Sequence, residues 1–211
     1  MKNILIALLC IASVELCAQN SPVKRPSNPG VTLDKALVLY GELSERTVLR
    51  HPSLMANQLF VYNSATTNHA EIIQHLEAAF AEKEIAVIPD GGKFVLIGPK
   101  SQQAALVPGA TNIAPTTTKL YPKGSIHFVN VTVGQVMTIY ADLIGKKLAQ
   151  GDPLPPMMFV AMIQTSELTR EECLYAFETL LRWQGWRLVP SGTDAIKPMQ
   201  VSREPDGQTK K

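Results

Sequence analysis

The chain has 211 residues, of which 45% are hydrophobic and 18% charged, and its formal net charge is +2. These proportions are typical of one or two small globular domains and exclude a chain that is disordered throughout. So small a positive charge gives little electrostatic reason to expect nucleic acid or an anionic membrane surface as a partner.

The N-terminus has the pattern of a secretory signal peptide. Lys2 precedes an apolar run from Ile4 to Val14, and Ala18 supplies a small residue for cleavage. The run is shorter than the ~20 residues that cross a bilayer as a helix. We expect residues 1–18 to be a signal peptide that exports the protein to the periplasm. The alternative is a segment that is retained as an anchor.

Residues 19–30 are predicted to be disordered, and a first folded unit follows over 31–97. It opens on the stretch VTLDKALVLYGELSERTVL, whose apolar residues recur at the spacing of one helix face. These residues are Leu33, Ala36, Leu37, Tyr40 and Leu43.

The rest of the first unit alternates strand and helix signals. A strand is predicted over 58–62, and a second amphipathic helix begins at His69. Strands at 85–88 and 94–98 flank the turn DGGK, which reads as a hairpin. The unit therefore contains two helices and several short strands.

A segment rich in Pro and Thr, 98–124, separates the first unit from a second one over 125–201. Four prolines punctuate this segment, so we expect a semi-extended linker. A strand over 126–130 opens the second unit, and residues 202–211 are predicted to be a disordered tail.

The second unit repeats the first, residue by residue. The stretch VTVGQVMTIYADLIGKKL lies 100 residues after its counterpart, and Tyr140 matches Tyr40. After a one-residue insertion the offset becomes 101, so that Glu172 matches Glu71 and Pro190 matches Pro89. A matched order of elements and matched apolar faces indicate an internal duplication. We also expect the residue after each tyrosine, Gly41 or Ala141, to let a neighbouring element approach closely.

Local signals predict how the elements of the two units end. Asn68 and Thr169 are the predicted N-caps of the two longer helices, each with a glutamate three residues later, as in a capping box. Gly185 is the predicted stop of the helix in the second unit. Pro198 lacks a backbone donor, which predicts that its strand lies at a sheet edge.

Two amphipathic helices with one apolar stripe each need a sheet face to cover. The predicted fold is therefore α+β, with two tandem small sandwiches. In each sandwich, two helices pack on one face of a three-stranded mixed sheet. Units of this size are near the lower limit for an independent core, so each should be marginally stable alone.

These patterns resemble the N-terminal periplasmic domains of secretins, the outer-membrane ring proteins of type II secretion and type IV pilus systems. The matching segments are VLYGELSERTVL with TTNHAEIIQHLEAAF, and TIYADLIGKKL with LTREECLYAFETLL. The resemblance covers 31–97 and 126–201 and implies tandem short modules of the kind that build rings. Secretins continue into a membrane-embedded barrel, and this sequence contains no such segment.

The element order also resembles KH-type RNA-binding modules. KH modules clamp the nucleic-acid backbone with a GXXG loop. Neither unit has that loop, because LSERT and LIGKKL occupy the corresponding corners. We therefore expect no nucleic-acid partner.

No residue pattern supports an enzyme, a metal or a cofactor. His69 and His75 are six residues apart, which places them on different sides of a helix rather than on one side as in a zinc site. Cys173 is the only cysteine outside the signal peptide, and its place on a helix core face predicts a small buried side chain. DGGK leads into no helix, so it forms no phosphate site. We expect no catalytic residues, no metal ligands and no small-molecule substrate.

The two units differ most clearly on the outer side of the second long helix. Tyr175, Thr179 and Trp183 are spaced by four residues, opposite the core stripe, and Arg182 lies beside them. The first unit has Gln74, Ala78 and Glu82 at the matched positions. Because aromatic residues and Arg are enriched at protein contacts, we predict that Tyr175, Thr179, Arg182 and Trp183 form an interaction surface. The alternative is that they pack against the first unit or the linker.

The sequence therefore predicts an exported, non-enzymatic structural or adaptor protein of a secretin-type secretion or pilus machine. Its partners would be a secretin, other envelope components or a second copy, with any outer-membrane association only indirect. The alternative is a module that senses a ligand or signal, like the short N-terminal domain of TonB-dependent receptors.

Overall fold

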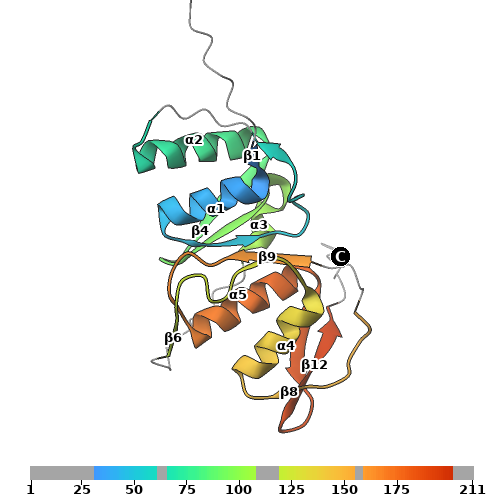
Figure 1. Cartoon of the computed structure of the whole chain (residues 1–211). Helices are drawn as coiled ribbons and strands as arrows, with labels where there is room; N and C mark the ends of the chain where they lie inside the picture. Colours follow the sequence, from blue (N-terminus) through green and yellow to red (C-terminus); the bar gives the residue numbers. More distant parts are fainter. Residues whose placement is uncertain (1–30, 61–65, 108–118, 155–158, 202–211) are drawn as a thin grey trace, which may run out of the picture.

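The structure is a computed structural model that describes residues 31–60, 66–107, 119–154 and 159–201. The predicted signal peptide, the predicted disordered segment 19–30 and the predicted tail 202–211 lie outside the described residues. The chain has an α+β fold, with helices packed against small sheets (Figure 1).

The first repeat unit, residues 31–99, contains two long helices and the strands around them. Its elements are β1 (Val31–Thr32), α1 (Leu33–Ser44), β2 (Thr47–Arg50), β3 (Leu59–Phe60), α2 (His69–Glu82), β4 (Ile85–Asp90) and β5 (Phe94–Pro99).

The second repeat unit, residues 128–200, has the same order of elements. They are β7 (Phe128–Thr132), α4 (Val133–Leu143), β8 (Lys147–Leu148), β9 (Phe159–Ile163), α5 (Arg170–Trp183), β11 (Trp186–Pro190) and β12 (Ala195–Gln200), with the short β10 (Leu168–Thr169) ahead of α5.

The strand registers confirm the predicted offsets between the units. Val31 pairs with Phe60 in β1–β3, and Val131 pairs with Val160 in β7–β9, each 100 residues further along. In the hairpins, Ile85 pairs with Pro99 and Trp186 with Gln200, each 101 residues further along. In both units the hairpin also pairs in parallel with the strand after the first helix, as β5–β2 and β12–β8.

The two units share one sheet, so an arrangement as two separate sandwiches is not confirmed. The larger sheet has the order β4-β5-β2-β9-β7, in which β9 and β7 come from the second unit. The junction is an antiparallel pairing of β9 with β2, with Leu49 opposite Met162. The smaller sheet, β11-β12-β8, belongs to the second unit alone.

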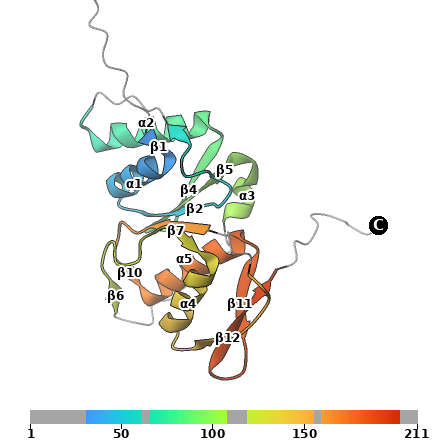
Figure 2. The same cartoon turned by 45° about the vertical axis from the view of Figure 1, so that its right-hand side comes forward.

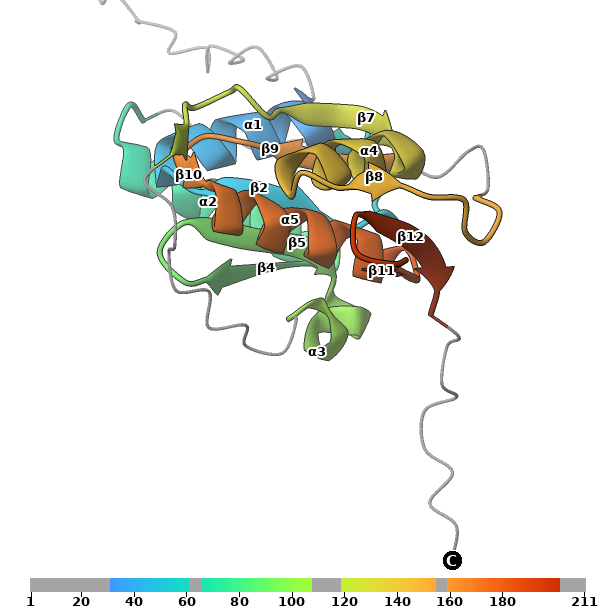
Figure 3. The same cartoon turned by 90° about the horizontal axis from the view of Figure 1, so that it is seen from below.

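Helices cover both faces of the five-stranded sheet (Figure 1). Because side chains alternate along a strand, Val48 and Val95 face α1 and α2, whereas Leu49, Phe94 and Leu96 face α4 and α5. The layer of α4 and α5 also packs against the smaller sheet, through Trp186, Leu188 and other residues of the same core. Figure 3 shows α4 and α5 lying across the larger sheet, with β11 and β12 beside them.

The composition of β5 explains why a second helical layer is needed. The run FVLIG is apolar at every position, and all five residues are buried. A strand covered on one face only would alternate apolar with polar residues. The predicted sandwich left Phe94 and Leu96 facing solvent, and the second unit covers them.

The predicted helix boundaries are largely confirmed. Asn68 caps α2 by accepting a hydrogen bond from the Ala70 backbone, and Thr169 forms a full capping box with Glu172 at the start of α5. Gly185, at φ +79°, follows Gln184, the C-cap of α5, in the left-handed conformation that suits glycine.

The predicted linker, 98–124, is not an extended spacer at its two described ends. It begins inside β5 and continues as a short 3₁₀ turn and α3 (Gln103–Leu106), where Leu106 is buried (Figure 2). Its other end contains β6 (Leu120–Tyr121), which pairs with β10. Residues 108–118 lie outside the described residues.

The edge position predicted from Pro198 is wrong, because β12 is the central strand of its sheet. Its parallel neighbour β8 ends at Leu148, so the ladder stops before it reaches Pro198. The Pro198 carbonyl instead accepts a hydrogen bond from the Asp152 backbone (3.2 Å) in the loop that follows β8. The missing donor of Pro198 therefore faces a loop and not a strand.

Candidate functional site

Tyr175, the first residue of the predicted interaction surface, lies against the first unit. Its hydroxyl donates a hydrogen bond to the Asp90 carboxylate at the end of β4, and its ring centroid lies 5.3 Å from that of Phe94. Burial, together with this hydrogen bond, raises the pKa of Tyr175 above its usual value of 10.0. Tyr175 is thus a neutral donor that links α5 to the larger sheet.

Trp183 lies two turns further along α5 and also contacts the first unit. Its indole Nε1 donates to the Leu106 carbonyl of α3 at 3.2 Å, and its ring lies 5.4 Å from the ring of His51. Burial lowers the pKa of His51, since the charged imidazolium would lose hydration there. The two aromatic side chains therefore contact opposite ends of the first unit's sheet.

Thr179 and Arg182 complete the predicted set. Thr179 is buried, and its hydroxyl donates to the Tyr175 carbonyl one turn earlier (2.9 Å). Arg182 is exposed in the last turn of the helix.

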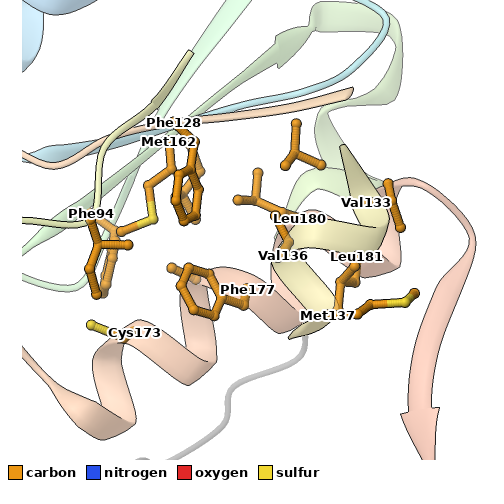
Figure 4. Packing of buried hydrophobic residues seen from close by; sticks show 14 of the residues in the cluster. Phe94, Phe128, Val133, Val136, Met137, Met162, Cys173, Phe177, Leu180 and Leu181 are labelled. Carbon is orange, nitrogen blue, oxygen red and sulfur yellow. The ribbon is translucent and has the colours of Figure 1, made fainter. Parts of the chain in front are cut away.

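Three of the four predicted residues are thus occupied inside the chain, as in the alternative interpretation of internal packing. Tyr175 and Trp183 form a latch between the units, Thr179 is buried within α5, and in this structure only Arg182 of the four is exposed. The physical reason is the second apolar face of the larger sheet, which needs a helix with large side chains on two of its sides. Figure 4 shows this core, with Phe94 from the first unit close to Phe177 and Cys173 of α5.

Polar contacts outside the predicted interaction surface add to the latch. Lys93, at the end of the β4–β5 turn, forms an ion pair with Glu172 (2.8 Å) and donates to the Glu167 carbonyl. The hydroxyls of Thr47 and Ser166 lie 3.1 Å apart. Glu172 has two tasks, because it also closes the capping box of α5.

A tyrosine–glutamate hydrogen bond occurs at the same place in both units. The hydroxyl of Tyr40 donates to Glu77, and that of Tyr140 donates to Glu178, each at 2.7 Å. Burial raises the pKa of both tyrosines, and the hydrogen bond to each carboxylate adds to the rise. Each pair ties the first helix of its unit to the second. The sequence shows that these residues are at matched positions, but it does not show that each tyrosine contacts its glutamate.

Grooves at equivalent places accompany these pairs. One, of about 410 Å³, lies between the end of α5 and the start of β11, and its walls include Glu178, Arg182 and Trp186. The other, of about 400 Å³, lies between α2 and β4, with Glu77, Ala81 and Ile85 at the matched positions. Both are open grooves beside an outer strand. At one matched helix position the groove of the second unit has Arg182, whereas that of the first unit has Ala81.

The metal-ligand and thiol candidates of the sequence can be located in the part of the chain that the structure describes. No group of three or more His, Cys, Asp or Glu side chains is placed there to hold a metal ion. Cys173 is buried, and burial raises the pKa of its thiol to about 12, so it stays protonated at neutral pH. The DGGK stretch forms the predicted turn between β4 and β5.

Within the described residues, no helix combines the length and the apolar character that crossing a membrane requires.

No protein-family model matches this chain, and none of the curated proteins is significantly similar to it in sequence.

Proposed function

We propose that the chain is an exported, non-enzymatic adaptor or structural protein of a secretin-type secretion or pilus machine. Its two repeat units, of the short secretin N-domain type, act through protein–protein contacts in the periplasm. In this proposal the functional parts of the chain are strand edges and side-chain surfaces that bind other proteins, and no catalytic centre is involved.

The observation that carries the proposal is the way one unit docks on the other. The second unit adds β9 to the edge of β2 and lays α5 across the face of the same sheet. The contact therefore combines backbone pairing with apolar burial, which are the two means by which protein modules add to an exposed sheet. A unit that holds its own duplicate in this way is a protein-docking module.

The arrangement within each unit supports the secretin comparison. Both units pair a β-hairpin in parallel with the strand that follows their first helix, and two helices cover one face. This is the arrangement expected of the short modules that the sequence resembles. The repeated tyrosine–glutamate pair shows that both units keep the same helix-to-helix contact.

The test is direct binding between the full-length mature chain and the periplasmic domains of the secretin encoded in the same genome. The chain is immobilised, and the secretin fragment is titrated over it in an optical biosensor. We expect saturable binding. The matched control is the barrel region of the same secretin without its N-terminal domains, which should not bind.

Binding of neither fragment would contradict the proposal. Binding of a receptor signalling domain in place of the secretin would favour the sensing alternative.

A further inference from the structure

The face of the smaller sheet that α4 and α5 leave open carries exposed cations beside apolar residues. The side chains of β11, β12 and β8 that point away from α4 and α5 are Lys147, Arg187, Val189, Ala195, Lys197 and Met199. The three cations are exposed, and the three apolar residues between them are half-buried. The equivalent face of the first unit's sheet is covered by α5 of the second unit.

The cations are close neighbours on this face. Lys197 pairs with Val189, Arg187 with Met199 and Lys147 with Ala195, so Lys197 is the diagonal neighbour of both other cations. Diagonal neighbours on a sheet are roughly 7–8 Å apart. None of the three takes part in an ion pair among the described residues.

The repeat shows that this charge is specific to the second unit. The residues matched to Lys147, Arg187 and Lys197 are Thr47, Ala86 and Leu96, all of which are buried. Thr47 and Leu96 contact the second unit. Arg182, at the rim beside β11, is matched by Ala81. Four uncharged positions in the first unit are therefore four cations in the second.

We propose that the open face of the smaller sheet docks an acidic amphipathic helix of a partner protein. A helix fits because the equivalent face of the first unit is covered by one, and Ala195 and Met199 on β12, with Val189 on β11, offer it apolar contacts on both sides of Lys197. Acidic side chains of that helix would pair with Arg187 on β11, with Lys147 on β8 and with Lys197, which lies between them on β12. This inference does not depend on the partner being a secretin.

A second copy of the chain fits this face poorly. Suppose that α2 of a second copy docked on this face in the way that α5 docks on the first unit. Glu71 would then take the place of Glu172, and Asp194 that of Lys93, so the internal ion pair would be replaced by two facing carboxylates. Like charges in direct opposition are repulsive. Nucleic acid and anionic lipid are also poorer fits, since the net charge of +2 attracts polyanionic surfaces weakly and the apolar residues offer a phosphate backbone nothing.

The probe is a labelled helical peptide of 14 residues, the length of α5, with a leucine stripe flanked by glutamates. A second peptide carries lysine for each glutamate. The full mature chain is titrated against both at low ionic strength, with fluorescence anisotropy as the readout. We expect the glutamate peptide to bind, the lysine peptide not to bind, and added salt to weaken the complex.

The variant Arg187→Gln/Lys197→Gln should weaken binding of the glutamate peptide by about tenfold or more. The matched control is Lys35→Gln/Lys83→Gln, which removes two exposed cations from the first unit and should leave affinity within about twofold. Thermal melting of both variants should be unchanged, since all four residues are exposed.

Three results would overturn the proposal. They are absence of binding by the glutamate peptide, equal binding by the face variant, and tighter binding of phosphatidylglycerol vesicles or a DNA duplex at the same residues. If the chain self-associates and the face variant abolishes that association, the occupant of this face is a second copy of the chain and not a partner's helix.

Discussion

At the scale of single residues, the tyrosine–glutamate pairs are the clearest feature that both units keep. Tyr40 and Tyr140 lie at matched positions and reach across to Glu77 and Glu178 on the next helix. The residue after Tyr40 is Gly41, where a Cβ would come within 3.0 Å of Thr165 and Val48. A small residue there lets the first helix lie close to the second unit.

Replacing Tyr40 or Tyr140 by Phe removes one hydrogen bond to a carboxylate and keeps the ring. We expect each change to lower the free energy of unfolding by about 1–2 kcal/mol, as measured by urea denaturation. Tyr121→Phe is the control, because the Tyr121 hydroxyl joins none of the hydrogen bonds found among the described residues. If the free energy of unfolding falls no more in the two variants than in the control, the tyrosine–glutamate pair has no stabilising role.

The residues of the predicted interaction surface illustrate what one sequence can and cannot reveal. Spacing predicted that Tyr175, Thr179 and Trp183 lie opposite the core side of the helix, whereas Thr179 is buried and the two aromatic rings pack against the same core. Spacing could not name the partner, because tyrosine and tryptophan suit an internal contact as well as an external one. The deciding signal lay elsewhere, in the uninterrupted apolar run of β5, which requires burial of both faces.

At the scale of elements, hydrophobic periodicity predicted the helices, the hairpins and the register shift between units. These are local properties, and the pairings confirm them. The assignment of β9 to the edge of β2 is not local, since it joins residues more than one hundred positions apart. Nothing in the periodicity of 58–62 and 158–162 says that the second segment extends another unit's sheet while the first does not.

The loop after β8 shows a constraint that only the coordinates reveal. Gly151 passes directly over Pro198, and a Cβ on Gly151 would lie 2.2 Å from the Pro198 carbonyl oxygen. The first unit has His51 at this position and Ile97 in place of the proline. The close approach of this loop to β12 therefore requires glycine at position 151.

Gly151→Ala should lower the free energy of unfolding by about 1–3 kcal/mol, because the new methyl group forces the loop away from β12. Gly92→Ala is the matched control, since a Cβ on Gly92 meets nothing within 4 Å. Denaturant melts of both variants provide the comparison. Equal stability of the two would contradict the close approach at Pro198.

At the scale of the whole molecule, the latch of α5 determines whether the two repeat units unfold together or separately. Tyr175, Trp183 and Glu172 each contact a different part of the first unit, and β9 adds backbone pairing. Contacts of this kind couple the two cores, so we expect one cooperative unfolding transition.

Giving α5 the residues of α2, with Tyr175→Gln and Trp183→Glu, should lower the free energy of unfolding by about 3–5 kcal/mol. Loss of two packed rings and burial of a carboxylate beside Leu106 are the causes. The control changes the matched exposed positions of the first unit, Gln74→Ala and Glu82→Ala, which should have little effect. Scanning calorimetry measures both. A variant with the melting temperature of the parent would mean that the stripe is not an internal contact.

The shared sheet also sets the order in which the molecule can be completed. As a nascent chain emerges, the hairpin and both helices of the first half are finished at Pro99, yet the edge of β2 and the apolar side chains of Leu49 and Leu96 stay bare. Their cover, β9 and α5, is made only after a further 59 residues or more, since β9 begins at Phe159. Until then the half-made protein is a candidate for aggregation and for chaperones that hold apolar surfaces, and a product cut short after Pro99 should be insoluble.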